Sequence, residues 1–242
     1  METKTCKTCS DTKPRVTADM FNNALRDHSM DDLRPTRSGR LITMGVDQGE
    51  VISHVVVCEW LFDRPLSADL GESAICKVLW VGRFPSSDWS QLDQLMAEFQ
   101  VLYAVVDADP DPSESRRFCR RFEGYAARTR YHGGSAGNEV TVKDADSGAP
   151  MVQVDRTSWI GAALGRFKVN PTRIWLPKDI PEEFKTHIMN LTRTVEKGPL
   201  GDVAGVYVTT GNGADHFAHS LVYAALGLKF APIDTTRSIR GI

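Results

Sequence analysis

The sequence predicts an α/β fold with a central mixed β-sheet flanked by α-helices. Two β-prone runs, 41–48 and 51–62, are separated by a short turn that contains glycine, and this pattern predicts a hairpin. Farther along the chain, segments with helical periodicity alternate with short apolar runs, which predicts crossover connections between strands. Hairpins and crossovers in one chain give a sheet with both antiparallel and parallel pairs.

The composition is that of an ordinary globular protein. The 242 residues are 41% hydrophobic and 25% charged, with a formal net charge of −2. This balance excludes a strongly basic, histone-like protein, but it allows a DNA enzyme whose basic groups are local. No run of about 18 apolar residues occurs, and the N-terminus lacks the apolar stretch of a signal peptide. We therefore expect an intracellular protein without a membrane span.

The N-terminal region 1–38 is polar. Within it, the amphipathic segment 17–30 predicts a short helix capped by Thr17, and 31–40 is typical of a linker. Cys6 and Cys9 form a CxxC pair, but a structural zinc ion needs two more ligands, and no second CxxC follows. The five cysteines are an odd number, so we expect reduced thiols and not a disulfide framework.

The middle of the chain predicts alternating strands and helices. Strand 74–84 precedes a helix over 88–99, which Asp88 or Ser87 caps and which has Trp89, Leu92 and Leu95 on one face. An apolar run from 101 ends in acids and prolines, as a buried strand does. A helix over 113–124 with Gly124 as its stop and a strand over 126–134 complete this part.

The last third predicts a hairpin, two helices and a further hairpin before a final apolar helix. The first hairpin spans 138–156 with a turn at Asp146–Gly148. The predicted elements that follow are a helix over 157–167 capped by Thr157 or Ser158, a strand over 173–177, a helix over 181–197 beginning at Pro181, and extended segments over 198–214. The final apolar helix begins at Asp215.

Three acids stand where an apolar element meets a turn. Asp47 ends the first strand, Asp107 ends a later buried strand, and Asp215 opens the last helix. The carboxyl ends of strands in an open α/β sheet face a common crevice, so Asp47 and Asp107 converge if their strands are neighbours. Clustered carboxylates repel one another, and hard divalent cations such as Mg²⁺ neutralise them. The pattern suits phosphodiester cleavage with two metal ions.

Each acid also has an ordinary explanation. Asp215 suits a helix N-cap, and Asp47 suits a turn. Asp107 has two acidic neighbours, Asp109 and Asp111, and all three suit a loop. The nearby His216 and His219 suit a helix surface or a packing role. Spacing alone leaves both interpretations open.

Three motifs contain the acids in order along the chain: "MGVDQG", "AVVDADPD" and "GNGADHFAHSLVYA", the last being the most specific. In this order they resemble the nuclease domain of tailed-phage large terminase subunits. The segments "VDRTSWIGAALGRFK" and "RIWLPKDIPEEFKTHIMNLTR" extend the resemblance, which covers about residues 40–230. It implies an RNase H-like fold and an endonuclease that cuts concatemeric double-stranded DNA during genome packaging.

The same resemblance implies the site residues. Asp47, Asp107 and Asp215 correspond to the family's catalytic acids, with Asp47 shared by two ions, Mg²⁺ or Mn²⁺. His216 corresponds to a metal ligand or to a group beside one. Some relatives have a further acid about where His219 or Ser220 stands here.

The resemblance also implies domains and partners. Residues 1–38 correspond to a linker or to the tail of an N-terminal ATPase motor, 39–235 to the nuclease domain, and 236–242 to a C-terminal tail. A P-loop is not found in the sequence, so we expect an excised domain or a split form. The implied partners are double-stranded DNA, the terminase ATPase domain, the small terminase subunit and the portal protein, in the cytoplasm of the infected bacterial host.

Basic residues that follow the acids are candidates for phosphate contact, and we expect a hairpin over 195–210 to gate the site. The basic candidates are Arg117, Arg120, Arg121, Arg128, Arg156, Arg166 and Lys168. Two other functions remain open at this point: another RNase H-like nuclease, such as a junction resolvase or a transposase-like enzyme, and a non-catalytic docking module of a packaging motor. Docking needs no carboxylate cluster, so the three acids argue against the last.

Overall fold

The computed structural model describes residues 15–31, 40–62, 74–132, 140–144, 147–197, 203–210 and 213–231. Predictions about Cys6 and Cys9, about most of the linker at 31–40, about the tail at 236–242 and about Asp146 lie outside these residues. In the described part of the chain, no helix is long and apolar enough to cross a membrane.

The predicted central mixed sheet is confirmed. In the described residues it has eight strands in the order β6-β7-β5-β4-β1-β2-β3-β8. β1, β2 and β3 form an antiparallel meander, whereas β4, β5 and β7 continue from β1 in parallel. The strands are β1 (Ile42–Asp47), β2 (Ile52–Leu61), β3 (Ile75–Pro85), β4 (Tyr103–Asp107), β5 (Ala126–His132), β6 (Val140–Lys143), β7 (Met151–Asp155) and β8 (Ile174–Trp175).

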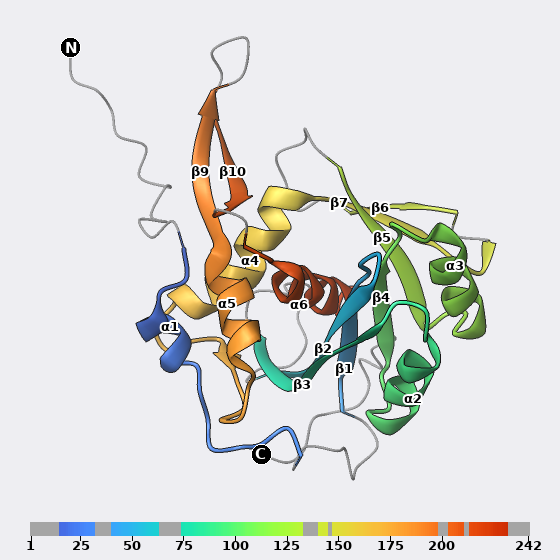
Figure 1. The fold of residues 1–242 in the computed structure, drawn as a ribbon, viewed down its shortest axis with the longest axis horizontal. Coiled ribbons are helices and arrows are strands. Elements are labelled where there is room, and N and C mark those ends of the chain that lie inside the picture. Colours follow the sequence, from blue (N-terminus) through green and yellow to red (C-terminus); the bar gives the residue numbers. More distant parts are fainter. Residues whose placement is uncertain are drawn as a thin grey trace.

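Helices cover both faces of this sheet (Figure 1). One face carries α2 (Ser90–Glu98) and α3 (Pro112–Arg121). The other carries α1 (Ala18–Asn22), α4 (Arg156–Lys168), α5 (Glu182–Asn190) and α6 (His216–Gly227). A separate antiparallel hairpin, β9 (Leu191–Lys197) and β10 (Val203–Thr209), projects beside α4 (Figure 1).

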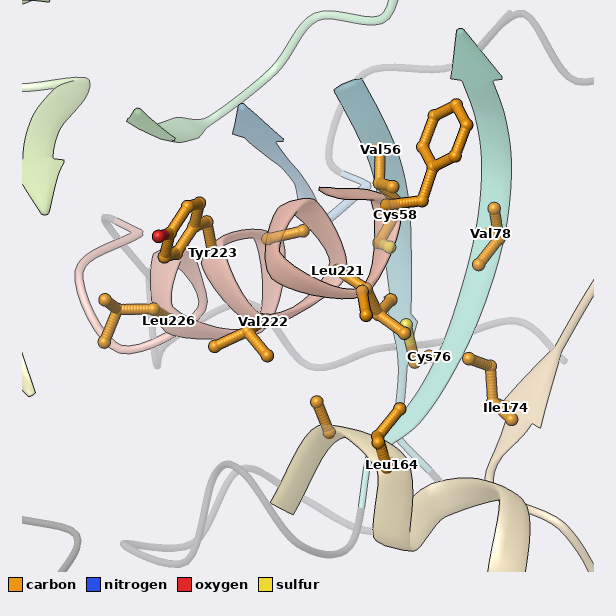
Figure 2. Close-up of a cluster of buried hydrophobic side chains, with 14 of the residues drawn as sticks. Val56, Cys58, Cys76, Val78, Leu164, Ile174, Leu221, Val222, Tyr223 and Leu226 are labelled. Atoms are coloured by element: carbon orange, nitrogen blue, oxygen red, sulfur yellow. The ribbon is translucent and has the colours of Figure 1, made fainter. Parts of the chain in front are cut away.

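Helix α6 is the centre of the second layer and is buried along most of its length. Figure 2 shows Leu221 of α6 among Cys58 of β2, Cys76 of β3 and Leu164 of α4. The approach to β1 is close because Gly45 has no side chain: a Cβ there would lie 1.9 Å from the main-chain oxygen of Ser220. The Thr43 hydroxyl, two residues earlier on the same face, donates to the carbonyl of Ala224 at 2.7 Å. The first turn of α6 is thereby placed beside the end of β1.

Several predicted boundaries and caps differ from the structure. The helix expected over 181–197 ends at Asn190, and strand β9 follows, because the β-branched residues Thr192, Thr194 and Val195 favour an extended chain. Helix α4 is capped by Asp155, whose carboxylate accepts the Ser158 N–H at 2.7 Å, and not by Thr157 or Ser158.

The predicted cap of α1 is confirmed, whereas two other predicted boundaries are shifted by one to three residues. Thr17 caps α1 through its hydroxyl, which accepts the N–H of Met20. Helix α3 ends at Arg121 with Phe122 at the C-cap position, three residues before the predicted stop at Gly124, which has φ +81 in the turn that follows. The Asp88 carboxylate accepts the Ser90 N–H at 3.3 Å, although Trp89 is the residue at the N-cap position of α2.

Candidate functional site

Asp47 and Asp107 lie side by side at the carboxyl ends of two adjacent parallel strands. Val46 of β1 is paired with Val106 of β4, so the two acids that follow occupy equivalent positions. Neighbouring strands are about 4.8 Å apart. Successive residues of β1 lie on opposite faces of the sheet. One face, with Thr43, Gly45 and Asp47, is the face toward α6. The other, with Ile42, Met44 and Val46, packs against the layer of α2 and α3. The two acids therefore face the first turns of α6, as the sequence predicted.

In the described part of the chain, no cation forms an ion pair with Asp107, and the charge of Arg130 acts on it only as a weak, longer-range interaction. The Asp107 carboxylate accepts the hydroxyl of Tyr223 at 3.0 Å and the main-chain N–H of Asp109 at 3.1 Å. Burial and, to a smaller extent, the negative charge of Asp47 raise the pKa of Asp107 to about 6, against the lowering effect of these hydrogen bonds. A cation bound beside Asp107 would favour its charged form and would lower this pKa.

Three histidines surround the free side of Asp47. His216, the first residue of α6, places its Nδ1 2.8 Å from Asp47 Oδ2, and this hydrogen bond raises the pKa of His216. His54 of β2 is paired with Asp47 across the hairpin, and its ring stacks on that of His216 with centroids 4.7 Å apart. His187 of α5 lies beside both rings. Burial, together with the charges of His216 and His187, lowers the pKa of His54 to about 4.

Asp47, His54 and His216 form a group whose ligand atoms all lie within 4.8 Å of one another. Among the described residues, this is the one cluster of at least three His, Cys, Asp or Glu side chains close enough to hold a single ion. Asp107 and Asp215 are not members of it. The three predicted acids line one end of the sheet, but they do not close around a single point.

The interpretation of Asp215 as a helix cap is wrong. Asp215 occupies the N-cap position of α6, yet its side chain makes no capping hydrogen bond. Instead it accepts the hydroxyl of Thr209 at 2.7 Å and lies 3.3 Å from Nε2 of His219. The N–H of Phe217, in the first turn, is taken by Nδ1 of His187 at 3.3 Å. A histidine from α5 thus does what the acid was expected to do.

The charge of Asp215 is compensated by the protein. Burial alone would raise the pKa of this carboxyl. The contact with His219, the Thr209 hydroxyl and the charge of Arg156, whose Nη2 is 3.9 Å away, together hold it well below its usual range. Asp215 therefore stays ionised without a metal ion.

A series of side-chain contacts connects Asp215 to Asp107. Nε2 of His219 faces Asp215, while its Nδ1 is 3.0 Å from the hydroxyl of Tyr131. The ring of Tyr131 lies 5.5 Å from that of Tyr223, whose hydroxyl donates to Asp107. These contacts fix the orientation of two acids that come from different elements.

Sequence reasoning missed His54, His187, Tyr131 and Tyr223 as parts of the site. Two of them had a detectable signal. A tight hairpin after Asp47 places a residue such as His54 opposite it. Asp215, His219 and Tyr223 are spaced i, i+4 and i+8, which is one face of a helix. His187 and Tyr131 come from α5 and β5, and their approach to α6 depends on tertiary packing.

The predicted phosphate-binding residues are distributed unevenly about the site. Arg128 and Arg166 are buried, at 2% and 9% exposure, and both donate to main-chain carbonyls, so the expectation that they contact DNA is wrong. Arg117, Arg120 and Arg121 are exposed on α3, in the layer that covers the opposite face of the sheet. Arg117 pairs with Glu114, and Arg121 pairs with Asp93.

Three other basic side chains lie near the acids or near the β9–β10 hairpin. Arg156 is close to Asp215, as described, and donates to the carbonyl of Tyr207. Lys168, at the end of α4, has its Nζ 5.9 Å from the centre of the Tyr207 ring. Arg130 of β5 is half-exposed and makes two hydrogen bonds, of 2.7 and 2.8 Å, to Asp109 just beyond Asp107. Arg130 and Arg156 therefore flank the acids.

An open pocket of about 340 Å³ adjoins the histidines. His54, His187 and His216 line it from one side, and Arg83 and Glu183, which pair with each other at 3.1 Å, line it from another. The β1–β2 turn completes its wall and includes Val51, which is 74% exposed. Solvent and small ions can thus reach the imidazoles from this side.

No family model and no curated protein matches the sequence. Solved structures do match. The nuclease domain of the large terminase subunit gp2 of bacterial virus Sf6, a mutant form with manganese, has a TM-score of 0.54 and 10% identity, over 87% of this chain and 97% of that chain.

Two further structures come from other phages. The large terminase nuclease domain of Thermus phage P74-26 has a TM-score of 0.47 and 16% identity, over 87% of this chain and 93% of that chain. The large terminase nuclease of thermophilic phage G20c with bound magnesium has a TM-score of 0.46 and 15% identity, over 88% and 97%. From the Sf6 match, the chain has the RNase H-like fold of large terminase nuclease domains, as the sequence resemblance predicted.

Proposed function

We propose that this chain is a metal-dependent endonuclease that cuts double-stranded DNA during phage genome packaging, as the nuclease domain of a large terminase subunit. One observation carries the proposal. Asp47 and Asp107 lie together at the carboxyl ends of β1 and β4, and burial and mutual repulsion raise the pKa of Asp107 to about 6. Carboxylates held together in this way suit a divalent cation.

The donor set fits Mg²⁺ or Mn²⁺. Asp47, Asp107 and Asp215 supply hard oxygen ligands, and His216 is placed to bind an ion or to orient Asp47 by hydrogen bonding. Manganese accompanies the Sf6 nuclease domain, which shares this fold. When two such ions are bound, the chemistry they supply is activation of a water molecule and stabilisation of the leaving oxygen.

The protein's own groups position the acids and the substrate. Tyr223 and the N–H of Asp109 hold Asp107, while Thr209 and His219 hold Asp215. Arg130 and Arg156 flank the acids and would neutralise phosphates of the bound strand. The β9–β10 hairpin precedes Asp215 directly, and it is suited to cover the bound DNA. The ATPase domain, small subunit and portal protein are the partners that packaging would require.

Cleavage of a supercoiled plasmid tests the proposal. Wild-type protein should nick or linearise the plasmid with Mn²⁺ or Mg²⁺ and leave it intact with EDTA. Asp47→Asn should reduce the rate by about a hundredfold or more, as removal of an electrostatic contact at a reacting group does. Asp93→Asn, on the surface of α2, is the matched control and should cut like wild type. If Asp47→Asn cuts at the wild-type rate, the central role of Asp47 is wrong.

A four-way junction offered beside the plasmid distinguishes the nuclease classes. A terminase-type enzyme should cut unbranched duplex at least as well as the junction. Clear preference for the junction would assign the chain to the resolvase class and would contradict the packaging role.

A further inference from the structure

We propose that Asp47, His54 and His216 form a binding site for a borderline transition cation such as Co²⁺ or Zn²⁺, next to the all-carboxylate position and sharing Asp47 with it. The three residues come from β1, β2 and α6, and their ligand atoms lie within 4.8 Å of one another. The inference deepens the proposed function by naming a cation class for part of the same site. Its principal test is binding, which does not depend on DNA cleavage.

His54 has the environment of a metal-binding histidine. It is 6% exposed, and in the described structure its buried Nδ1 has no hydrogen-bond partner. Burying such a nitrogen unpaired costs free energy, which coordination of an ion would offset. Its Nε2 faces the Glu183 carboxylate at 3.9 Å. Histidines that bind metals commonly direct the other ring nitrogen to a carboxylate, which leaves Nδ1 of His54 for the ion.

The donor types decide the class of cation. Mg²⁺ prefers oxygen ligands and loses its waters reluctantly, so two imidazoles with one carboxylate suit it poorly. Imidazole nitrogens suit Zn²⁺ and neighbouring transition ions, and affinity for such sites increases from Mn²⁺ through Co²⁺. Two imidazoles and a carboxylate, with room for water, also make up the ligand set of known zinc centres.

The site is reachable and can adapt. His54 and His216 both line the open pocket, but Nδ1 of His54 is buried, so an ion can reach it only when the His216 ring moves aside. Ligands that share an ion at about 2.1 Å must come closer together than the present arrangement allows. The His216 side chain is 43% exposed and can move, whereas Asp47 is held in the sheet. Coordination would replace the present Asp47–His216 hydrogen bond.

The experiment measures Co²⁺ binding by visible absorption and Zn²⁺ binding by calorimetry on metal-stripped full-length protein. Cys6 and Cys9 could bind the same ions, so every sample carries Cys6→Ser and Cys9→Ser. In this background we expect Co²⁺ and Zn²⁺ to bind more tightly than Mg²⁺. His54→Gln and His216→Gln should each weaken Co²⁺ binding by at least about tenfold. His28→Gln, at a histidine that contacts β3 elsewhere, is the control and should bind Co²⁺ like the background protein.

Asp107→Asn separates this site from the carboxylate position. It should weaken Mg²⁺ binding and leave Co²⁺ binding within about threefold, because Asp107 is not among the three ligands. Unchanged Co²⁺ affinity in a folded His54→Gln variant would overturn the inference, as would Co²⁺ and Zn²⁺ binding no tighter than Mg²⁺ in the background protein. Failure of plasmid cleavage with tight, His54-dependent Co²⁺ binding would contradict the proposed nuclease function alone.

Discussion

Asp107 and Asp215 are both largely buried acids, but the protein treats their charges in opposite ways. Asp107 receives hydrogen bonds from neutral groups and faces the negative charge of Asp47, and its pKa is raised to about 6. Asp215 lies beside His219, Thr209 and Arg156, and its pKa is held low. The sheet end of the site therefore has an excess of negative charge, which a cation would balance if the proposed function is right, whereas groups of the protein already stabilise the charge at the helix end.

The largest expected difference between the two acids is in metal affinity. If the proposed function is right, Asp107→Asn should weaken Mn²⁺ binding by about a hundredfold, because it removes a ligand whose charge forms no ion pair among the described residues. Asp215→Asn should weaken it by only about fivefold, since Arg156 and His219 already attenuate that charge. Calorimetric titration of both variants measures the two effects. Equal losses would show that Arg156 and the hydrogen bonds to Asp215 do not reduce the contribution of its charge to metal binding.

The stability of the metal-free protein should change in opposite directions. Asp107→Asn removes an uncompensated buried charge, so it should raise the free energy of unfolding at pH 7.5 by about 1–3 kcal/mol. Asp215→Asn weakens contacts with His219 and Thr209, so it should lower the free energy of unfolding by about 1–3 kcal/mol. Urea unfolding in EDTA gives both values. A change of the same sign in the two variants would contradict the comparison.

The change in the free energy of unfolding caused by Asp107→Asn should depend on pH over a defined range. The folded-state pKa of about 6 exceeds the ordinary value of 3.8, so between these values the folded protein binds more protons than the unfolded chain. The contribution of Asp107 to stability therefore falls as pH rises from about 4 to about 6. The advantage of Asp107→Asn over wild type should grow across this range and stay constant above it. A pH-independent difference between the two unfolding curves would show that the Asp107 pKa is ordinary.

The smallest expected effect concerns the hydroxyl that orients Asp107. Tyr223→Phe keeps the buried ring and removes the hydrogen bond to the carboxylate. That bond favours the charged form, so its loss should move the pH midpoint of Mn²⁺ binding upward by about half a unit to one unit, corresponding to about 1 kcal/mol. Tyr125→Phe, at a tyrosine that is 51% exposed, is the control. A midpoint that does not move would leave Tyr223 with a packing role only.

The sequence predicted the sheet end of the site better than the helix end. Asp47 and Asp107 each end an apolar run, and two adjacent strand ends were enough to bring them together. The contacts of Asp215 could not be predicted in this way, because Thr209 and Arg156 reach it through the packing of β10 and α4 against α6. The helix-start position of Asp215 suggested a cap, and only the structure reveals that His187 fills that role.

Charge in the sequence was also a poor guide to exposure. Arg128 and Arg166 were expected at the surface, but both are buried and donate to the main-chain carbonyls of Ala149 and Ala74. The end of α5 was also mispredicted. The sequence predicted one helix over 181–197, whereas α5 ends at Asn190 and the β-branched residues that follow form strand β9. Long-range contacts decided the burial of the two arginines, whereas the local preference of β-branched residues decided the end of α5.

The missing side chain of Gly45 sets the spacing of the whole site. A methyl group there would collide with the main chain of Ser220 and Ala224, and neither can yield without shifting the helix. We therefore expect Gly45→Ala to push α6 away from β1 and to carry His216 and Asp215 with it. A residue without a side chain thus sets the distance between Asp47, two positions farther along β1, and the first turn of α6. We therefore expect substitutions at Gly45 to be tolerated less well than substitutions at many exposed charged residues of the protein.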